Sequence, residues 1–524
     1  MDCEHPVLEA GWQPAWVQEG REPAFEKALN QPPESRTHRS VIPAANCLQL
    51  AYNEGDARNR DFKLCFAASG DIRNLVKTVN GLPKGYRGKC DILLNDTDAI
   101  TVNRNLVILY ALLSAGPTIE ESAELATHLM YSAALPAASA AYLRGCICVI
   151  YGDGASDGDM SFQSSLRTRG AGRIHSMQTT IAMRRPLEMF LSTYELRKGI
   201  DSMQSVMFDP LREDNRDRYL TGLKPAHRLA VMHYWRSGIL APFSLEIKDF
   251  SQPNRLMFTA NGGWLGHAGA NPLHGWDVSD VRASGAKHGI DSADIFGCLF
   301  FHVKRELMEF ARRMKEFHVD IHLTQFDSQV LSKGISIGVL PRFAEACFDR
   351  IETSNLVDER GVKDSLNNWG PLLNRNNEHA CIIMHSRDWH LSQPKATAQS
   401  NPRAVEILIE RCSHVPALEL RLRHAFTQGA KSPAVMRLIQ SLDAFIDHEE
   451  AFQEYLRSQH AGETAERLGL RLRGFNRINS KRFGVPMDAP KQKLPDLTRD
   501  AFYDIFTIGG ADFPIRFVEF EGIS

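Results

Sequence analysis

Small and polar residues that could bind a ligand follow directly on a short apolar run. The run from Phe62 to Ala67 predicts a strand buried on both faces of a parallel sheet, and Ser69, Gly70 and Asp71 come soon after it. A hydroxyl, a carboxylate and the free N–H groups of a following helix can hold a polar ligand. The sequence therefore predicts a ligand crevice at this turn. A turn with a helix cap and no ligand is the alternative.

A helix and a second strand are expected to hold this turn in place. Asp71 can cap a helix over residues 72–79, in which apolar residues recur at helical spacing. Glycine and proline then end the helix, and a strand over residues 91–94 leads into Asn95 and Asp96. This order predicts a right-handed β-α-β unit, whose ligand lies beyond the carboxyl ends of the strands.

Later strands end in polar residues as well. A strand over residues 319–323 leads to Asp327, and residues 348–358 indicate a strand that ends in polar side chains. Because the carboxyl ends of parallel strands share one edge of a sheet, we expect these side chains in one crevice. The candidate ligand-binding residues are Gly70, Asp71, Arg73, Asn74, Asn95, Asp96, Asp327, Ser354, Asn355 and Asp358.

The common signatures of phosphate and metal sites are missing. A dinucleotide fingerprint needs three glycines in the first turn, where this chain has one, and a phosphate-cradling loop is absent. His318 and His322 lack a third ligand, as do His385 and His390, and the cluster at 151–159 lacks the closing glutamate of an EF-hand. No metal site is predicted.

Length and composition narrow the class of protein. Of the 524 residues 43% are hydrophobic and 24% charged, and the net charge of −2 excludes a globally basic nucleic-acid binder. Ten scattered cysteines without a CxxC pair favour free thiols in a reducing compartment. The polar start is unlike a signal peptide, and the longest apolar stretch, 106–115, is too short to span a bilayer. We therefore expect a cytoplasmic protein without membrane contact.

Alternating strands and helices predict an α/β fold with a Rossmann-like, mostly parallel sheet, helical insertions and a helical C-terminal region. A chain of this length exceeds a single core. The expected parts are an N-terminal arm (1–45), the first half of the Rossmann-like domain (46–180), a helical and irregular insertion (181–290), the second half (291–395) and a C-terminal region with a basic segment and a closing strand (396–524). Further expected elements are a strand at 146–150, an amphipathic helix at 303–317, helices within 402–460, and an edge strand at 513–518.

One segment near the C-terminus is strongly basic. Residues 467–493 hold eight basic residues against one acid, with Phe475 and Phe483 among them. Such a segment can follow an RNA backbone and stack bases, although a solvated surface is the ordinary alternative. The candidate RNA contacts are Arg467, Arg471, Arg473, Arg477, Lys481 and Arg482.

Several motifs resemble a known family. The chain is similar to a fungal domain of unknown function that often follows a MYND zinc finger and is related to a domain of an axonemal dynein assembly factor. The segments that carry the resemblance are 12–25, 67–74, 94–96, 272–276 and 348–355. The cysteines and histidines of the finger are absent here. The resemblance implies a Rossmann-like domain similar to class I methyltransferases.

In size and plan the chain is also similar to fungal enzymes that build arginine-containing cyclodipeptides from aminoacyl-tRNAs. That resemblance implies that Ser69 accepts an acyl group, as a serine does after the first strand of bacterial cyclodipeptide synthases. N–H groups after Gly70 would stabilise the oxyanion. One carboxylate among Asp71, Asp96, Asp327 and Asp358 would bind a guanidinium, and the basic segment would hold arginyl-tRNA and a second aminoacyl-tRNA. No cofactor is expected for this reaction.

Two other functions remain open on the sequence. In an S-adenosylmethionine-dependent methyltransferase, Gly70 would approach the methionine part of the cofactor and Asp96 would bind the ribose hydroxyls. The single glycine and the lack of an acidic residue before the turn speak against this function. A non-catalytic assembly factor with a degenerate Rossmann-like domain is the third possibility. The second amino acid and the oligomeric state are left open.

Overall fold

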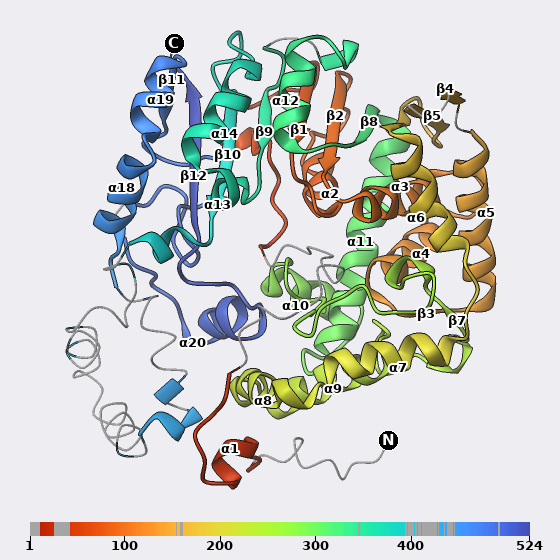
Figure 1. Ribbon diagram of the computed structural model, residues 1–524, viewed down its shortest axis with the longest axis vertical. Coiled ribbons are helices and arrows are strands. Elements are labelled where there is room, and N and C mark those ends of the chain that lie inside the picture. The colour runs from red at the N-terminus through yellow and green to blue at the C-terminus, as the bar shows by residue number, and fades with distance from the viewer. Residues whose placement is uncertain are drawn as a thin grey trace.

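A ten-stranded sheet forms the centre of the described part of the chain (Figure 1). The computed structural model describes residues 11–25, 42–153, 155–157, 161–343, 346–393, 446–490 and 493–523, with scattered positions between 396 and 444. In spatial order the strands are β11 (Leu470–Leu472), β12 (Arg516–Gly522), β10 (Cys381–Ser386), β9 (Arg350–Glu352), β1 (Phe62–Phe66), β2 (Lys89–Asp96), β8 (His318–Gln325), β6 (Arg173–Gln178), β5 (Ser161–Arg167) and β4 (Ala155–Asp157).

The central strands have the order of a Rossmann fold. β1, β2 and β8 pair in parallel in one direction from β1, and β9 and β10 pair in parallel in the other. β6 continues the parallel part beside β8, whereas β12 runs antiparallel to β10. The predicted α/β fold with a Rossmann-like, mostly parallel sheet is therefore confirmed. Because the strand order reverses between β1 and β9, the switch point where such sheets bind ligands lies there.

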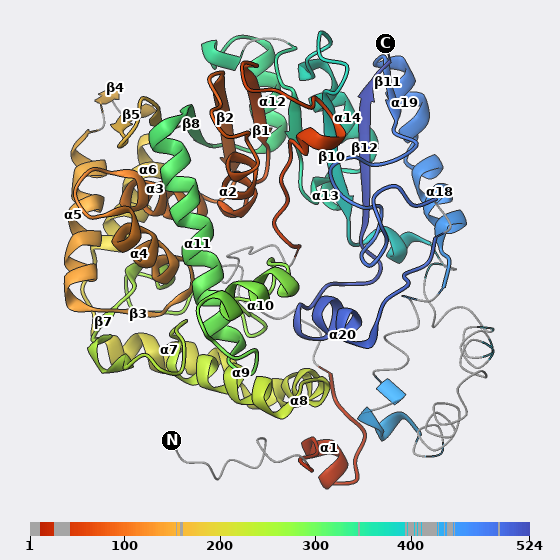
Figure 2. The ribbon, with the colours of Figure 1, turned by 180° about the vertical axis from the view of Figure 1, so that it is seen from behind.

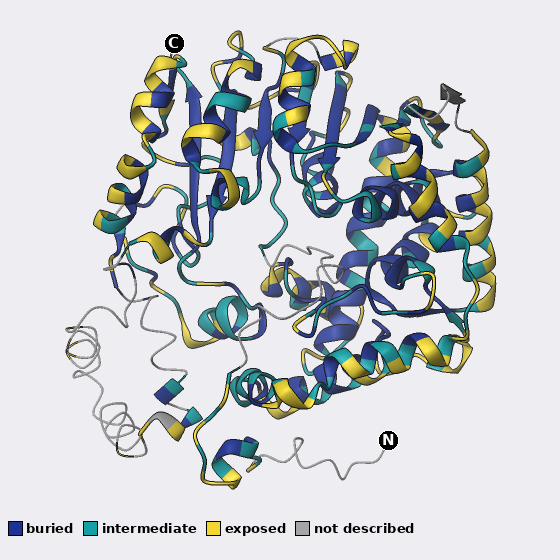
Figure 3. Cartoon of the chain, in the orientation of Figure 1, coloured by how far each residue is buried: buried dark blue, intermediate teal, exposed yellow. Residues whose placement is uncertain are grey.

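Helices cover both faces of this sheet (Figures 1 and 2). Alternate residues of β1 enter different cores: Leu64 packs with α2, α3 and α11, and Cys65 packs with α12, α14, α18 and α19. The strands β12, β10, β9, β1 and β2 are almost entirely buried, whereas β5 alternates between buried and exposed residues (Figure 3). The helices named here are α2 (Arg73–Asn80), α3 (Ala99–Leu113), α11 (Ile295–Glu316), α12 (Ser328–Ser336), α14 (Val362–Trp369), α18 (Glu449–Ser458) and α19 (Ala461–Arg467).

Most of the remaining described helices extend the first core away from the sheet, whereas α13 packs into the second core through Val357. α7, α8 and α9 lie together at the end of the molecule opposite β1 and β2 (Figures 1 and 2). A two-stranded sheet of β3 (Ala134–Leu135) and β7 (Gln252–Pro253) joins the predicted insertion to the first core. These helices are α1 (Ala15–Gln18), α4 (Ile119–Tyr131), α5 (Ala137–Asp153), α6 (Thr180–Leu191), α7 (Leu196–Met207), α8 (Glu213–Gly222), α9 (Pro225–Ser237), α10 (Val278–Lys287), α13 (Leu356–Arg360) and α20 (Arg499–Phe502).

Three local predictions differ from the structure. Residues 146–150 belong to α5 and not to a strand, because the alanine-rich stretch before them continues as helix and buries Cys146, Ile147 and Ile150 at helical spacing. The strand expected over 348–358 shortens to β9, and Asp358 lies in α13. The closing strand begins at Arg516, and β11 lies outside it, so it is not the edge. Most of 402–445 and of the arm lies outside the described residues.

The described residues include no helix that is long and apolar enough to cross a membrane. All eight described cysteines are free thiols, and six of them are buried.

Candidate functional site

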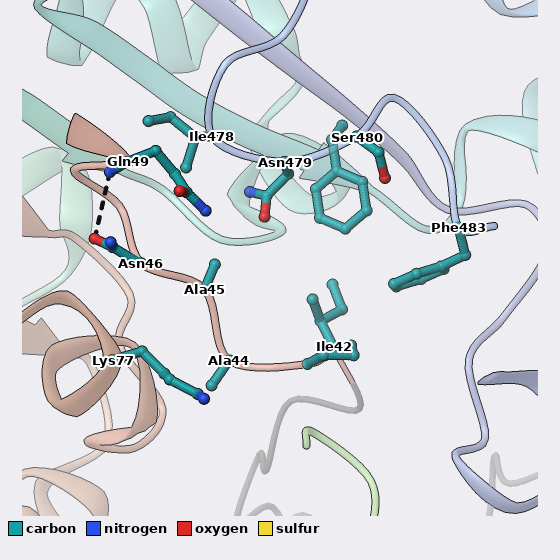
Figure 4. Close-up of a pocket in the computed structure, with 12 residues that line it drawn as sticks. Ile42, Ala44, Ala45, Asn46, Gln49, Lys77, Ile478, Asn479, Ser480 and Phe483 are labelled. Atoms are coloured by element: carbon teal, nitrogen blue, oxygen red, sulfur yellow. Dashed lines mark hydrogen bonds between the residues drawn. The ribbon is translucent and has the colours of Figure 1, made fainter. Parts of the chain in front are cut away.

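Two adjoining cavities lie at the switch point between β1 and β9. The inner chamber, of about 30 Å³, is lined by Ile42, Pro43, Ala45, Cys47, Ala68, Ser69, Asp71, Arg73, Asn74, Glu352, Ser354, His385, Asn479 and Phe517. The outer chamber, of about 300 Å³, shares five of these residues and adds Ala44, Asn46, Gln49, Lys77, Ile478, Ser480 and Phe483. Figure 4 shows its two walls, one from residues 42–49 and Lys77 and one from residues 478–483.

Ser69 lies at the turn between β1 and α2. Its N–H donates to the Asn95 carbonyl at 2.8 Å, and the N–H of Gly70 donates to the Asp96 carboxylate at 2.9 Å. Gly70 has φ of +60°, a conformation that favours glycine. Among the described residues the Ser69 hydroxyl has no hydrogen-bond partner, so it is available to a ligand in the inner chamber.

The N–H groups that were expected to form an oxyanion site are mostly occupied. The N–H of Gly70 is bound by Asp96, that of Asp71 donates to the Ser69 carbonyl at 2.5 Å, and that of Arg73 donates to Asp71 at 2.9 Å. The tight turn therefore uses two of the N–H groups after Gly70, those of Asp71 and Arg73, and an oxyanion role for the other N–H groups at the start of α2 stays a prediction.

Asp71, Arg73 and Asn74 line the inner chamber as predicted, and each is held by a neighbour. The Arg73 guanidinium is buried, pairs with Asp71 at 2.8 Å and donates to the His274 carbonyl at 3.2 Å. Asn74 accepts the N–H of Ala45 at 3.0 Å. The start of α2 is thereby tied both to the insertion and to the segment that walls the chamber.

Replacing Gly275 with alanine is expected to displace Arg73. Gly275 has φ of +93°, and a Cβ there would lie 1.1 Å from Nη1 of Arg73. We expect Gly275→Ala to lower the free energy of unfolding by about 2 kcal/mol. Gly289→Ala is the matched control, since Gly289 has φ of +72° in open space and should lose only about 1 kcal/mol. Urea denaturation measures both variants, and equal losses would contradict the packing argument.

Asn95 and Asp96 bind groups at the neighbouring strand ends, and their assignment to ligand binding stays a prediction. The buried Asn95 amide donates to the carbonyls of Ala67 and Phe326 and accepts from Thr324 and Phe326. Asp96 accepts the N–H groups of Gly70 and Asp98. The neighbouring strand ends use these side chains, and neither residue lines a chamber.

Of the other predicted ligand-binding residues, one lines the inner chamber and four do not. Ser354 lines the inner chamber, whereas Gly70, Asp327, Asn355 and Asp358 do not. Asp327 caps α12 and pairs with Arg360 at 2.7 Å. Asp358 accepts the Ser386 hydroxyl and the Arg387 N–H, and so holds the turn after β10. The carboxylates of Asp71, Asp96, Asp327 and Asp358 thus each have a partner within the protein, and the guanidinium contact expected of one of them stays a prediction.

Glu352 is the chamber residue that sequence reasoning missed. It ends β9, its side chain is buried, and Oε1 accepts the Ser354 N–H at 2.8 Å. Burial raises the pKa of Glu352 to about 7, against the lowering effect of that hydrogen bond. The sequence held one signal, because Arg350 and Glu352 alternate with Ile351 and so place two charges on one face of a buried strand.

His385 and Cys47, which also line the inner chamber, are neutral near pH 7. Burial lowers the pKa of His385 to about 3. Burial, and then the Glu352 charge, raise the pKa of the Cys47 thiol. Ser354 has φ of +53°, which is uncommon for a residue other than glycine, and this backbone directs its N–H to Glu352. No group of three ligating side chains in the described ranges could hold a metal ion.

Two buried ion pairs hold the walls of the chambers. Arg350 pairs with Glu54 at 2.7 Å and donates to the carbonyls of Cys47 and Leu48, which fixes the first wall. Glu519 pairs with Arg473 at 2.7 Å and accepts the N–H groups of residues 477–479, which fixes the second wall.

The basic segment is therefore only partly exposed. Arg473 is buried against Glu519 and Glu521, and Arg482 is buried against the carbonyls of residues 444 and 446. This corrects their assignment to RNA contact, because a buried guanidinium cannot reach a phosphate. Arg467 and Arg471 are exposed, and Arg477 and Lys481 are half-buried next to the second wall.

Comparison with known proteins gives one match. Residues 40–135, which contain β1, α2, β2 and Ser69, match DUF4470, a domain of unknown function. No curated protein matches the chain. No solved structure matches it either. The first wall and the turn at Ser69 therefore lie within the part of the chain that matches this domain of unknown function.

Proposed function

We propose that the protein is a tRNA-dependent cyclodipeptide synthase that makes an arginine-containing diketopiperazine from aminoacyl-tRNAs in fungal secondary metabolism. The observation that carries this proposal is the free hydroxyl of Ser69 in the inner chamber at the switch point of the sheet. The resemblance to fungal arginine-containing cyclodipeptide synthases supports it. The proposed substrates place the reaction in the cytoplasm, where aminoacyl-tRNAs are found.

The proposed reaction has three steps. The Ser69 hydroxyl attacks the ester carbonyl of the first aminoacyl-tRNA; a seryl ester forms, and the tRNA leaves with its terminal hydroxyl, which receives the serine proton. The amine of the seryl-bound residue attacks the ester of a second aminoacyl-tRNA and releases that tRNA. The free amine of the dipeptide then attacks the Ser69 ester, so that the ring closes and the hydroxyl is regenerated.

The outer chamber and its surroundings suit the acceptor end of a tRNA. It is ten times the volume of the inner chamber and is bordered by Lys77, Phe483 and the amides of Gln49 and Asn479. Aromatic rings stack bases, and cations attract phosphates. Arg477 and Lys481 continue the second wall toward solvent. These groups support the use of an RNA-linked substrate.

The alternative as a methyltransferase has less support. Asp96, which would bind the ribose of S-adenosylmethionine, already accepts the N–H groups of Gly70 and Asp98. The third hypothesis, a non-catalytic assembly factor, predicts that the protein turns over no substrate. Both remain outcomes of the experiment that follows.

Ser69→Ala is expected to reduce product by about 10³-fold or more, as removal of a catalytic nucleophile does. The wild-type chain and the variant are expressed in yeast grown on isotope-labelled arginine, and extracts are searched by mass spectrometry for a labelled diketopiperazine. Ser205→Ala on the exposed face of α7 is the matched control and should leave product unchanged.

A wild-type host without any labelled diketopiperazine, or equal product from Ser69→Ala, would contradict the synthase. S-adenosylmethionine binding by calorimetry that is lost in Asp96→Ala would favour the methyltransferase instead. If neither product nor cofactor binding is found, the assembly factor is favoured.

A further inference from the structure

We propose that Glu352 binds the cationic end of the substrate side chain, so that the inner chamber is specific for an amino acid with a guanidinium or ammonium group. The identity of this ligand as a substrate rests on the proposed function, whereas the cation site itself rests on the geometry of the chamber. It assigns to Glu352 the role that the sequence had suggested for four aspartates.

Glu352 has no cation beside it, unlike most buried carboxylates of the described residues. Asp349 also lacks an ion pair, but it accepts the Lys63 N–H and the side-chain amides of Asn374 and Asn377. Glu54 pairs with Arg350 at 2.7 Å, Glu519 with Arg473 at 2.7 Å, and Asp214 with Arg21 at 2.6 Å. The one hydrogen bond described for the Glu352 carboxylate is that from the Ser354 N–H. A buried carboxylate is stable as an anion only when a counter-charge reaches it, and here the chamber leaves that place to a ligand.

The charged groups near Glu352 do not supply the counter-charge. Arg350, two residues earlier on β9, directs its guanidinium to Glu54 and the first wall. Arg73 is paired with Asp71. His385 is neutral and the thiol of Cys47 adds no positive charge. A ligand cation in the chamber would therefore meet one unpaired carboxylate.

The walls of the chamber suit a long, apolar stem. Ile42, Pro43, Ala45, Ala68 and Phe517 contribute apolar surface, along which the methylenes of an arginine or lysine side chain can pack. The inner chamber of about 30 Å³ has room for about two water molecules, so it can take only the cationic end, stripped of most of its hydration. The stem would extend along Ile42, Pro43, Ala45 and Phe517, which line the outer chamber as well. Ser69 lines the same chamber, so a residue esterified to it would have its side chain beside Glu352.

Calorimetry on the whole chain tests this site with three amino acid amides of similar length. They are L-argininamide, L-lysinamide and L-citrullinamide, which is the neutral isostere of argininamide. The wild type is expected to bind at least one cationic amide about ten-fold or more tighter than citrullinamide. Glu352→Gln, which keeps the shape and removes the charge, should lose that preference. Glu359→Gln on the exposed side of α13 is the matched control and should retain it.

The contradicting results are distinct from those for the synthase. Equal binding of charged and neutral amides by the wild type, no binding of any amide at millimolar concentration, or a preference that survives in Glu352→Gln would overturn the cation site. A clear preference without any labelled diketopiperazine would keep the cation site and contradict the synthase. Argininamide and lysinamide separate a guanidinium from an ammonium site.

Discussion

Glu352→Gln is expected to be about 3 kcal/mol more stable than the wild-type protein at pH 8, and less than about 1 kcal/mol more stable at pH 5. Burial raises the pKa of Glu352 from 4.5 to about 7. Above pH 7 the wild-type chain must hold an unpaired anion in the fold, which the amide of the variant avoids. The gain arises at a residue that lines the inner chamber, so higher stability should accompany the loss of cation binding.

The sign follows from where the proton binds. Below pH 4.5 the carboxyl is protonated in both the folded and the unfolded chain, so the group has no effect. Between pH 4.5 and about 7 only the folded chain holds the proton, and stability falls by about 1.4 kcal/mol per pH unit. Above about 7 the full difference of about 3 kcal/mol is reached.

Urea denaturation of both proteins across this range measures the effect. Taking the difference between variant and wild type cancels the titration of other groups such as His385. A difference that does not grow between pH 5 and pH 8 would show that the Glu352 carboxyl is not held in a desolvated chamber. Argininamide at saturation should stabilise the wild type more than the variant at pH 8, because the ligand supplies the missing charge.

Glu519→Ala is expected to lower the free energy of unfolding by about 3–5 kcal/mol. Glu519 is fully buried, pairs with Arg473 and accepts three successive backbone N–H groups of residues 477–479. Its removal leaves those donors without an acceptor and leaves Arg473 with Glu521 as its one carboxylate partner, beside the His379 carbonyl. Because Asn479 lines both chambers, the second wall should loosen as well.

One further variant separates the charge of Glu519 from its hydrogen bonding, and a second serves as a surface control. Glu519→Gln keeps an acceptor oxygen and should lose less stability than Glu519→Ala. Glu316→Ala, at the exposed end of α11, is the control and should be within about 0.5 kcal/mol of the wild type. If Glu519→Ala is as stable as Glu316→Ala in urea denaturation, the anchoring role of Glu519 is wrong.

Local patterns in the sequence were enough for the fold around Ser69. The apolar run of β1, the helical spacing of α2 and the turn residues between them all lie within some thirty-five residues that fold against one another. Burial periodicity reports which face of each element is inside, and this pattern depends little on distant residues. Burial periodicity gave the wrong element at 146–150, because a short apolar run suits a helix and a strand alike. There the preceding alanine-rich stretch forms a helix that continues through these residues.

The partners of each charge depended on the tertiary structure. Glu352 reaches the chamber of Ser69 because β9 pairs with β1, although nearly three hundred residues separate the two strands in the sequence. The same pairing brings Arg350 to Glu54, and β12 brings Glu519 under the basic segment and buries Arg473.

By itself the sequence determined a Rossmann-like sheet, a polar turn at its switch point and Ser69 within that turn. The tertiary structure alone decided which carboxylates of that region are satisfied and which is left unpaired. The physical reason is that burial follows from local patterns, whereas the compensation of a buried charge depends on a partner that only the long-range topology supplies.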